Sequence, residues 1–135
     1  KHEKVKIYMD SRIADCKASG YSETILGRKR MIPEIGASNF MVRQLGERLA
    51  MNTPIQGSAA DIIKLAMIGV YRELKEYFPQ SRLILQVHDE LIIEALTSEK
   101  EQVAKILKEE MENAAKLSVP LKVDMKTGRS WYDTK

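Results

Sequence analysis

The sequence contains few of the residues that build covalent cross-links or membrane spans. Its 135 residues include one cysteine, Cys16, so an internal disulfide is excluded. Cys16 lies on the apolar side of a helical pattern, which predicts a buried structural thiol rather than a reactive one. No apolar run approaches the roughly 18 residues that a membrane-spanning helix needs, and no signal peptide opens the chain. The expectation is a soluble protein of a reducing, cytoplasmic compartment.

Histidine is also scarce, and the sequence has no internal repeat, low-complexity tract or flexible linker. A metal phosphohydrolase built on a His-Asp pair needs further histidines, and the only candidates are His2 and His88. That class of enzyme is therefore disfavoured. With 44% hydrophobic residues the chain can bury one core, as a single globular unit or as a piece of a larger one. It begins inside a helical pattern without a capping signal, which favours a piece.

Positive charge is concentrated in one stretch of the chain. The net charge is +3, and residues 28–48 carry all of this excess because five cations there oppose only Glu34 and Glu47. The five cations are Arg28, Lys29, Arg30, Arg43 and Arg48. Such a stretch is typical of proteins that bind phosphate backbones, although a solvated basic loop shows the same pattern.

Three ionisable residues, His88, Asp89 and Glu90, stand between two apolar runs of strand length within residues 83–95. This pattern predicts a β-hairpin with the polar groups at its tip. Mg²⁺ prefers oxygen ligands and takes several from water and phosphates, so two carboxylates on a rigid turn suggest a hard-cation site. Ordinary turn chemistry is the alternative. The tip lacks the glycine that short hairpin turns favour, and such departures are frequent at functional sites.

The first 37 residues are predicted to form a helix followed by a short hairpin. Apolar residues recur at helical spacing up to Cys16, and Gly20 can end that helix. A hairpin is expected over residues 21–32, with its arms at 24–26 and 30–32 and a basic turn.

Two further helices are expected on either side of a proline. Ser38 or Asn39 can cap a helix that runs to about Asn52. Pro54 is then expected to begin a new helix, since proline is tolerated at the first helical position. Asp61 lies in the first turns of that helix, where a carboxylate interacts favourably with the helix dipole, and a metal-binding role is the alternative.

The rest of the chain predicts a small layered fold. After the hairpin at 83–95, Ser98 and Glu101 have the spacing of a capping box, and Pro120 is expected to end the helix that they begin. Residues 121–125 alternate apolar and charged side chains, which predicts a strand with one buried face. The order strand, strand, helix, strand indicates an α+β fold with helices packed on a small antiparallel sheet.

Two motifs then stand in order along the chain. Residues 47–61 read Glu-Arg-Leu-Ala-Met-Asn-Thr-Pro-Ile-Gln-Gly-Ser-Ala-Ala-Asp, and residues 86–90 read Gln-Val-His-Asp-Glu. Together they closely resemble the C-terminal polymerase region of family A DNA polymerases, the bacterial DNA polymerase I type. The similarity extends from Gly-Arg-Lys-Arg at 27–30 to Trp131-Tyr132.

The resemblance implies a part of a DNA-directed DNA polymerase of replication and repair. Such enzymes transfer a nucleotide from a dNTP to a primer 3′-hydroxyl with two Mg²⁺ ions. Residues 1–37 would form the end of the fingers, and residues 38–135 the C-terminal part of the palm with the hairpin at 83–95. The implied partners are primer-template DNA, dNTP and the rest of the polymerase chain, with no membrane. The implied setting is the bacterial cytoplasm, at the nucleoid.

The resemblance also assigns site residues by position. Asp89 matches the aspartate that binds catalytic metal, Glu90 an adjacent carboxylate that assists the metal site, and His88 a residue near the primer terminus. Six residues match positions that face DNA, and these are Arg28, Lys29, Arg30, Arg48, Asn52 and Gln56. If the helix is nearly continuous across the proline, Asn52 and Gln56 share a face, and their amides could read minor-groove acceptors, which look similar in every base pair.

Other parts of the family's site do not occur in the sequence. The segment resembling Asp-Tyr-Ser-Gln-Ile-Glu, which carries the other essential metal-binding aspartate, is missing, as are the nucleotide-holding fingers helix and the thumb. The resemblance therefore implies that these 135 residues are inactive alone and that an aspartate outside them completes the metal site. A nucleic-acid-binding module without catalysis, based on residues 28–48, is the alternative.

Overall fold

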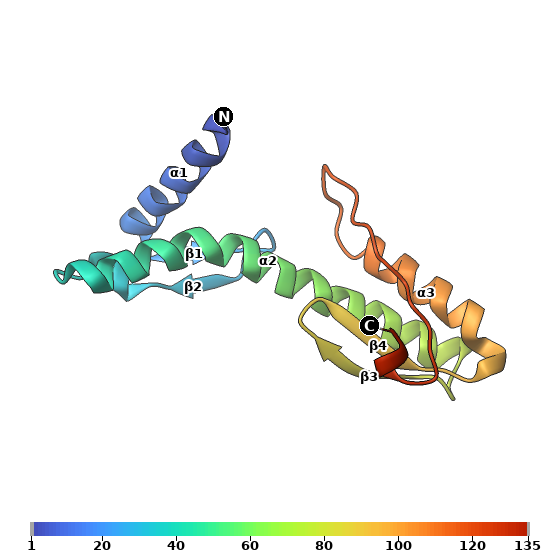
Figure 1. Cartoon of the computed structure of the whole chain (residues 1–135). Helices are drawn as coiled ribbons and strands as arrows, with labels where there is room; N and C mark the ends of the chain where they lie inside the picture. Colours follow the sequence, from blue (N-terminus) through green and yellow to red (C-terminus); the bar gives the residue numbers. More distant parts are fainter. Residues whose placement is uncertain (1, 135) are drawn as a thin grey trace. The chain divides into compact units, whose positions relative to one another are not determined.

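The computed structural model describes residues 2–134, which form two compact units that divide after Asp61. The described helices are α1 (Glu3–Ser19), α2 (Phe40–Tyr77) and α3 (Lys100–Glu112) (Figure 1). The strands are β1 (Tyr21–Glu23), β2 (Lys29–Met31), β3 (Arg82–Val87) and β4 (Glu90–Glu94). Short 3₁₀ turns are η1 (Pro33–Gly36), η2 (Thr97–Glu99) and η3 (Trp131–Thr134). Helices with two antiparallel two-stranded sheets confirm the predicted α+β class.

The first unit has a small core between α1, η1 and the start of α2. Its buried members are Cys16, Ile32, Ile35 and Ala50. The predicted first helix is confirmed, and Gly20 ends it in the left-handed conformation, with φ +78° and its N–H bonded to the Cys16 carbonyl. Cys16 is 1% exposed and burial raises its pKa, so the prediction of a buried thiol is also confirmed.

The hairpin of the first unit was predicted with one arm misplaced. β1 pairs with β2 in the register Ser22 to Arg30, so the hairpin itself is confirmed. The predicted arm at 24–26 is wrong, because these residues form the turn. Thr24 closes the turn with its backbone, accepting from Gly27 N–H and donating to the Arg28 carbonyl, each at 3.0 Å.

A single helix, α2, runs from Phe40 to Tyr77 with Pro54 inside it. Asn39 caps its start by accepting from Met41 N–H at 2.9 Å, as predicted. The predicted break before Pro54 is wrong. Proline cannot donate to the carbonyl four residues earlier, which belongs to Ala50. Ser22 of β1 supplies the missing donor, because its buried hydroxyl lies 3.2 Å from that carbonyl oxygen.

Gly57 lets the turn of the first hairpin approach α2 closely. A Cβ added at Gly57 would lie 2.7 Å from the Thr24 methyl, a distance that real Cβ atoms do not show. At the next residue, the Ser58 hydroxyl donates to the Pro54 carbonyl and accepts from Ile25 N–H at 2.9 Å. The proline segment is thus hydrogen-bonded to the hairpin on both sides.

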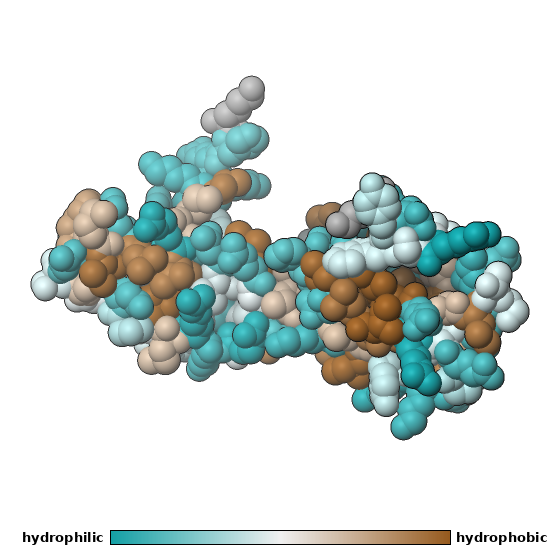
Figure 2. Space-filling view, turned by 60° about the horizontal axis from the view of Figure 1, so that its bottom comes forward, coloured by the Kyte–Doolittle hydropathy of each residue, from teal (hydrophilic) through white to brown (hydrophobic). Residues whose placement is uncertain are grey.

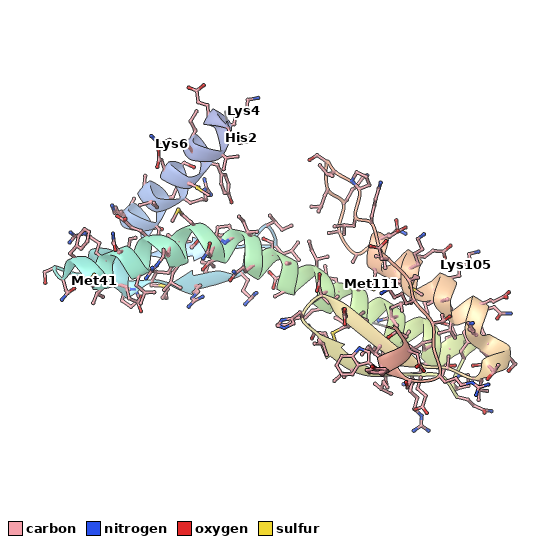
Figure 3. The ribbon with its side chains drawn as sticks, in the orientation of Figure 1. His2, Lys4, Lys6, Met41, Lys105 and Met111 are labelled. Atoms are coloured by element: carbon pink, nitrogen blue, oxygen red, sulfur yellow. The ribbon has the colours of Figure 1, made fainter. Side chains whose placement is uncertain are left out.

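The second unit packs the end of α2, the β3–β4 hairpin and α3 around one apolar core. The buried members are Ile63, Ala66, Val70, Leu74, Leu91, Val103 and Leu107. Met111 of α3 packs against this core, whereas Lys105 on the same helix extends into solvent (Figure 3). The hairpin predicted at 83–95 is confirmed.

Three local predictions for the second unit are wrong. α3 begins after η2, and no side-chain cap is formed at its start, so the Ser98–Glu101 capping box is absent from this described segment. Glu99 accepts from the buried Ser81 hydroxyl at 2.6 Å. α3 ends at Glu112, before Pro120. Residues 121–125 show the predicted alternation in burial but pair with no described strand.

Apolar side chains also reach the surface of the second unit. Figure 2 shows them gathered on the face that this view presents. Exposed apolar residues of the unit include Ile68, Ile84 and Leu85. Large exposed apolar areas usually mark contact surfaces. None of the described helices combines the length and apolar character needed to cross a bilayer.

Substituting Ser22 by alanine should destabilise the first unit. The Ala50 carbonyl would stay buried without a donor, because the proline cannot replace the hydroxyl. We expect a loss of about 1–3 kcal/mol in the free energy of unfolding, measured with urea. Ser11→Ala is the matched control, since that hydroxyl bonds an exposed carbonyl in α1 and its loss should cost less than about 0.5 kcal/mol. Equal effects of the two substitutions would contradict this role of Ser22.

Two glycines inside α2 should respond oppositely to alanine. Gly69→Ala would meet only the flexible carboxylate end of Glu110, so helix propensity should stabilise it by up to about 1 kcal/mol. Gly57→Ala should instead destabilise by about 1–3 kcal/mol, because the branched and buried Thr24 cannot move away freely. Thermal unfolding of both variants tests this, and a stabilised Gly57→Ala would refute the close approach.

Candidate functional site

The tip of the β3–β4 hairpin is a two-residue turn. Val87 pairs with Glu90, and His88 and Asp89 connect the two strands. His88 has φ +53°, a left-handed conformation that glycine or asparagine usually adopts. The glycine-free tip noted in the sequence therefore places backbone strain directly before Asp89.

The strands that support this turn are held in a defined register. The Gln86 side-chain amide donates to the His88 carbonyl at 2.8 Å and so contacts the strained residue directly. Further down, the register shifts between Leu83 and Leu85, which makes Ile84 the extra residue of a bulge. Bulges increase the local twist of a strand pair and often lie near functional sites. Leu91 anchors β4 in the core.

Asp89 and Glu90 both present exposed carboxylates at this tip, with exposed His88 beside them. Within residues 2–134 no three His, Cys, Asp or Glu side chains gather closely enough to hold a metal. The tip thus offers two carboxylates at most. This donor set suits Mg²⁺, which commonly takes one or two protein carboxylates and fills its other positions with water and phosphate oxygens.

A row of polar side chains follows one face of α2. Arg48, Asn52 and Gln56 are spaced by four residues and are all exposed. Because the helix continues through Pro54, the three side chains lie on one face. Their spacing places an arginine and two amides along about two turns of helix.

The basic residues of the first hairpin lie beside the same helix. Arg28, Lys29 and Arg30 are exposed. The Lys29 ammonium lies 4.4 Å from the centre of the Tyr21 ring, and a hydrogen bond with the Tyr21 side chain raises the pKa of Lys29. A cavity of about 90 Å³ lies between part of this hairpin and α2. Its lining includes all three cations together with Gln56.

Asp61 has a role that sequence reasoning missed. It lies in the middle of α2, so the prediction that it faces a helix N-terminus is wrong. Its buried carboxylate accepts from Arg28 Nε at 2.7 Å and from the Thr24 hydroxyl at 2.6 Å. No local pattern in the sequence indicates this role, because the two hairpin residues that bond Asp61 lie 37 and 33 positions before it.

The structure brings the predicted site residues together in two groups. His88, Asp89 and Glu90 share the hairpin tip of the second unit. In the first unit, Gln56 lies with the three basic residues along one cavity. Arg48 and Asn52 extend that group along α2.

Comparison with known proteins gives three consistent matches. The family model described as DNA polymerase family A matches residues 1–133. DNA polymerase I of Caldicellulosiruptor bescii is 53% identical over 135 residues, which is 100% of this chain and 16% of that protein. DNA polymerase I of Bacillus subtilis is 54% identical over 131 residues, which is 97% of this chain and 15% of that protein.

A solved structure matches as well. The polymerase domain of Pol1 from M. smegmatis, described as a complex with DNA primer-template and dNTP, superimposes with a TM-score of 0.92 at 45% identity. The match covers 96% of this chain and 23% of that one. The chain thus spans about a sixth of the length of the curated relatives it matches. Since the family model covers nearly every residue, the chain belongs to DNA polymerase family A.

Proposed function

We propose that the chain is the C-terminal part of a DNA-directed DNA polymerase, which adds nucleotides from dNTP to a primer 3′-hydroxyl in replication and repair. The observation that carries this proposal is the hairpin tip, where a rigid two-residue turn presents Asp89 and Glu90 within a family A sequence. A carboxylate on a tight turn between paired strands, such as Asp89, is held more firmly than a carboxylate on a long loop.

Asp89 and Glu90 are proposed to hold catalytic Mg²⁺, with Asp89 as the main ligand and Glu90 as an assisting carboxylate. When bound, a pair of such ions stabilises the charge that develops on the attacking and leaving oxygens of in-line phosphoryl transfer. A further aspartate from outside residues 1–135 is proposed to complete the set. His88 is proposed to lie at the primer terminus, next to the strained turn that aims Asp89.

The row on α2 is proposed to contact the primer-template. Asn52 and Gln56 carry amides that can bond the minor-groove acceptors, which look similar in every base pair, so a polymerase can check pair geometry without reading sequence. Arg48 supplies charge at one end of the row. The residues Arg28, Lys29 and Arg30 are proposed to bind backbone phosphates on the template side.

The rest of the polymerase chain is proposed as the partner of the exposed apolar surface. Exposed Ile68, Ile84 and Leu85 are costly in water unless other protein covers them. Within the complete enzyme, residues 1–37 are proposed to end the fingers and residues 38–135 to belong to the palm. The proposed setting is the bacterial cytoplasm, at the nucleoid.

A second candidate function is nucleic-acid binding without catalysis. The concentration of charge in residues 28–48 favours it for the isolated chain. Binding to primed duplex that weakens steeply with salt, without nucleotide addition, would support this behaviour. A lack of binding at low salt would count against it.

Replacing Asp89 by alanine should abolish catalysis in the complete polymerase. Loss of a metal ligand removes several kcal/mol of transition-state stabilisation, so primer extension should slow by at least about 10³-fold. Glu94→Ala is the matched control, because Glu94 is an exposed carboxylate on the same hairpin, away from the tip. Its extension rate should stay within about twofold of the parent. A similar slowing in both variants would contradict a specific role for Asp89.

The isolated chain should bind primed DNA but not extend it. The tip offers two carboxylates, and no group of three metal-ligating side chains forms among the described residues. Primer extension with labelled dNTP and Mg²⁺ measures this directly. Extension by the purified chain that Asp89→Ala abolishes would refute the claim that the metal site is incomplete.

A further inference from the structure

The Asp61 carboxylate connects the turn of the first hairpin to the middle of α2. The side chain is only 10% exposed, although it is charged. One of its oxygens accepts from Arg28 Nε at 2.7 Å, and the other accepts from the Thr24 hydroxyl at 2.6 Å. A carboxylate in this environment is expensive to bury unless both oxygens are satisfied. Its placement therefore fixes the two turn residues that it contacts.

Arg28 is held along one edge and exposed along the rest. Its Nη2 donates to the Gly57 carbonyl at 3.1 Å, and its backbone N–H donates to the Thr24 hydroxyl at 3.1 Å. The side chain is nevertheless 53% exposed. A guanidinium has five N–H donors, and the side-chain bonds of Arg28 occupy the edge formed by Nε and Nη2. The group is thus oriented before any ligand arrives.

The cavity beside Arg28 has the lining of a site for a single phosphate. Its volume is about 90 Å³, and it is lined by Thr24, Arg28, Lys29, Arg30, Thr53, Gln56 and Gly57. The lining contains three cations, and one of them, Arg28, is paired with Asp61. The lining therefore keeps positive charge, which suits the single negative charge of a phosphodiester.

We propose that this cavity seats one backbone phosphate of bound DNA and that Asp61 is the positioning residue that holds Arg28 in its wall. The inference rests on the proposed function and adds a role for Asp61, which is too buried to touch DNA itself. An arginine that is oriented in advance loses less side-chain freedom on binding, so it contributes more affinity than a mobile one.

Asp61→Asn separates this proposal from simple electrostatics. The substitution removes a negative charge beside the cavity, so electrostatics alone would make DNA bind more tightly. The proposal gives the opposite sign, because the single amide oxygen of asparagine cannot accept from both Arg28 Nε and the Thr24 hydroxyl, so Arg28 is held less firmly. Arg28→Lys provides a second variant, which keeps the positive charge but loses the planar, forked arrangement of N–H donors.

The test is the affinity of the complete polymerase chain for fluorescently labelled primed duplex across a series of salt concentrations. Each of Asp61→Asn and Arg28→Lys should raise the Kd about three- to tenfold. Because Arg28→Lys keeps the cation that displaces counterions, its slope of log affinity against log salt should stay near the parent value. The double variant should raise the Kd little beyond either single variant. In steady-state extension, each variant should raise KM for primer-template by a larger factor than it lowers kcat.

Lys100→Gln is the control, because Lys100 is an exposed cation at the start of α3. Tighter or unchanged binding of Asp61→Asn would overturn the proposal, as would additive effects in the double variant. If Asp61→Asn fails to fold, parental affinity of Arg28→Lys would overturn it instead. If the parent enzyme shows no salt-dependent DNA binding, the proposed function itself is refuted. If the parent binds DNA and only the variants behave differently from this expectation, the proposed phosphate site at the cavity is refuted.

Discussion

The hydrogen bond from the Ser22 hydroxyl to the Ala50 carbonyl is the contact on which the first unit depends. Pro54 removes the helical donor for that carbonyl, and an unsatisfied buried acceptor would favour a broken helix. Since Ser22 belongs to the hairpin, α2 can satisfy the Ala50 carbonyl and continue through Pro54 only when the hairpin is packed against it. The polar row on α2 follows from this continuity, because a break would rotate Asn52 away from Gln56.

A comparable constraint governs the hairpin of the second unit. A left-handed His88 costs backbone energy, and paired strands with a buried Leu91 hold it in place. Gln86 adds a bond to the carbonyl of the strained residue. Strain of this kind fixes the direction of the next side chain, Asp89. In the proposed mechanism a ligand held in this way need not reorganise when metal and substrate bind.

The sequence predicted which segments form helices and hairpins better than it predicted element ends or contacts between distant segments. The hairpin at 83–95 was predictable because its apolar runs flank a polar tip, and the tip residues follow from that pattern. The break at Pro54 was wrongly predicted, because the donor that replaces the missing proline N–H is a serine 28 residues before Ala50. The same limit applies to Asp61, whose partners lie in the hairpin turn. Residues 121–125 alternate in burial as predicted, but pairing also requires a partner strand.

The position of the metal ion tests whether Asp89 is a catalytic metal ligand. Crystals of the complete polymerase with primed DNA, an unreactive dNTP analogue and Mn²⁺ would reveal the ion by its anomalous scattering. The account predicts a peak about 2.1 Å from a carboxylate oxygen of Asp89, with substrate phosphate oxygens among the other ligands. An ion held entirely by other carboxylates, with Asp89 turned away from it, would contradict the account.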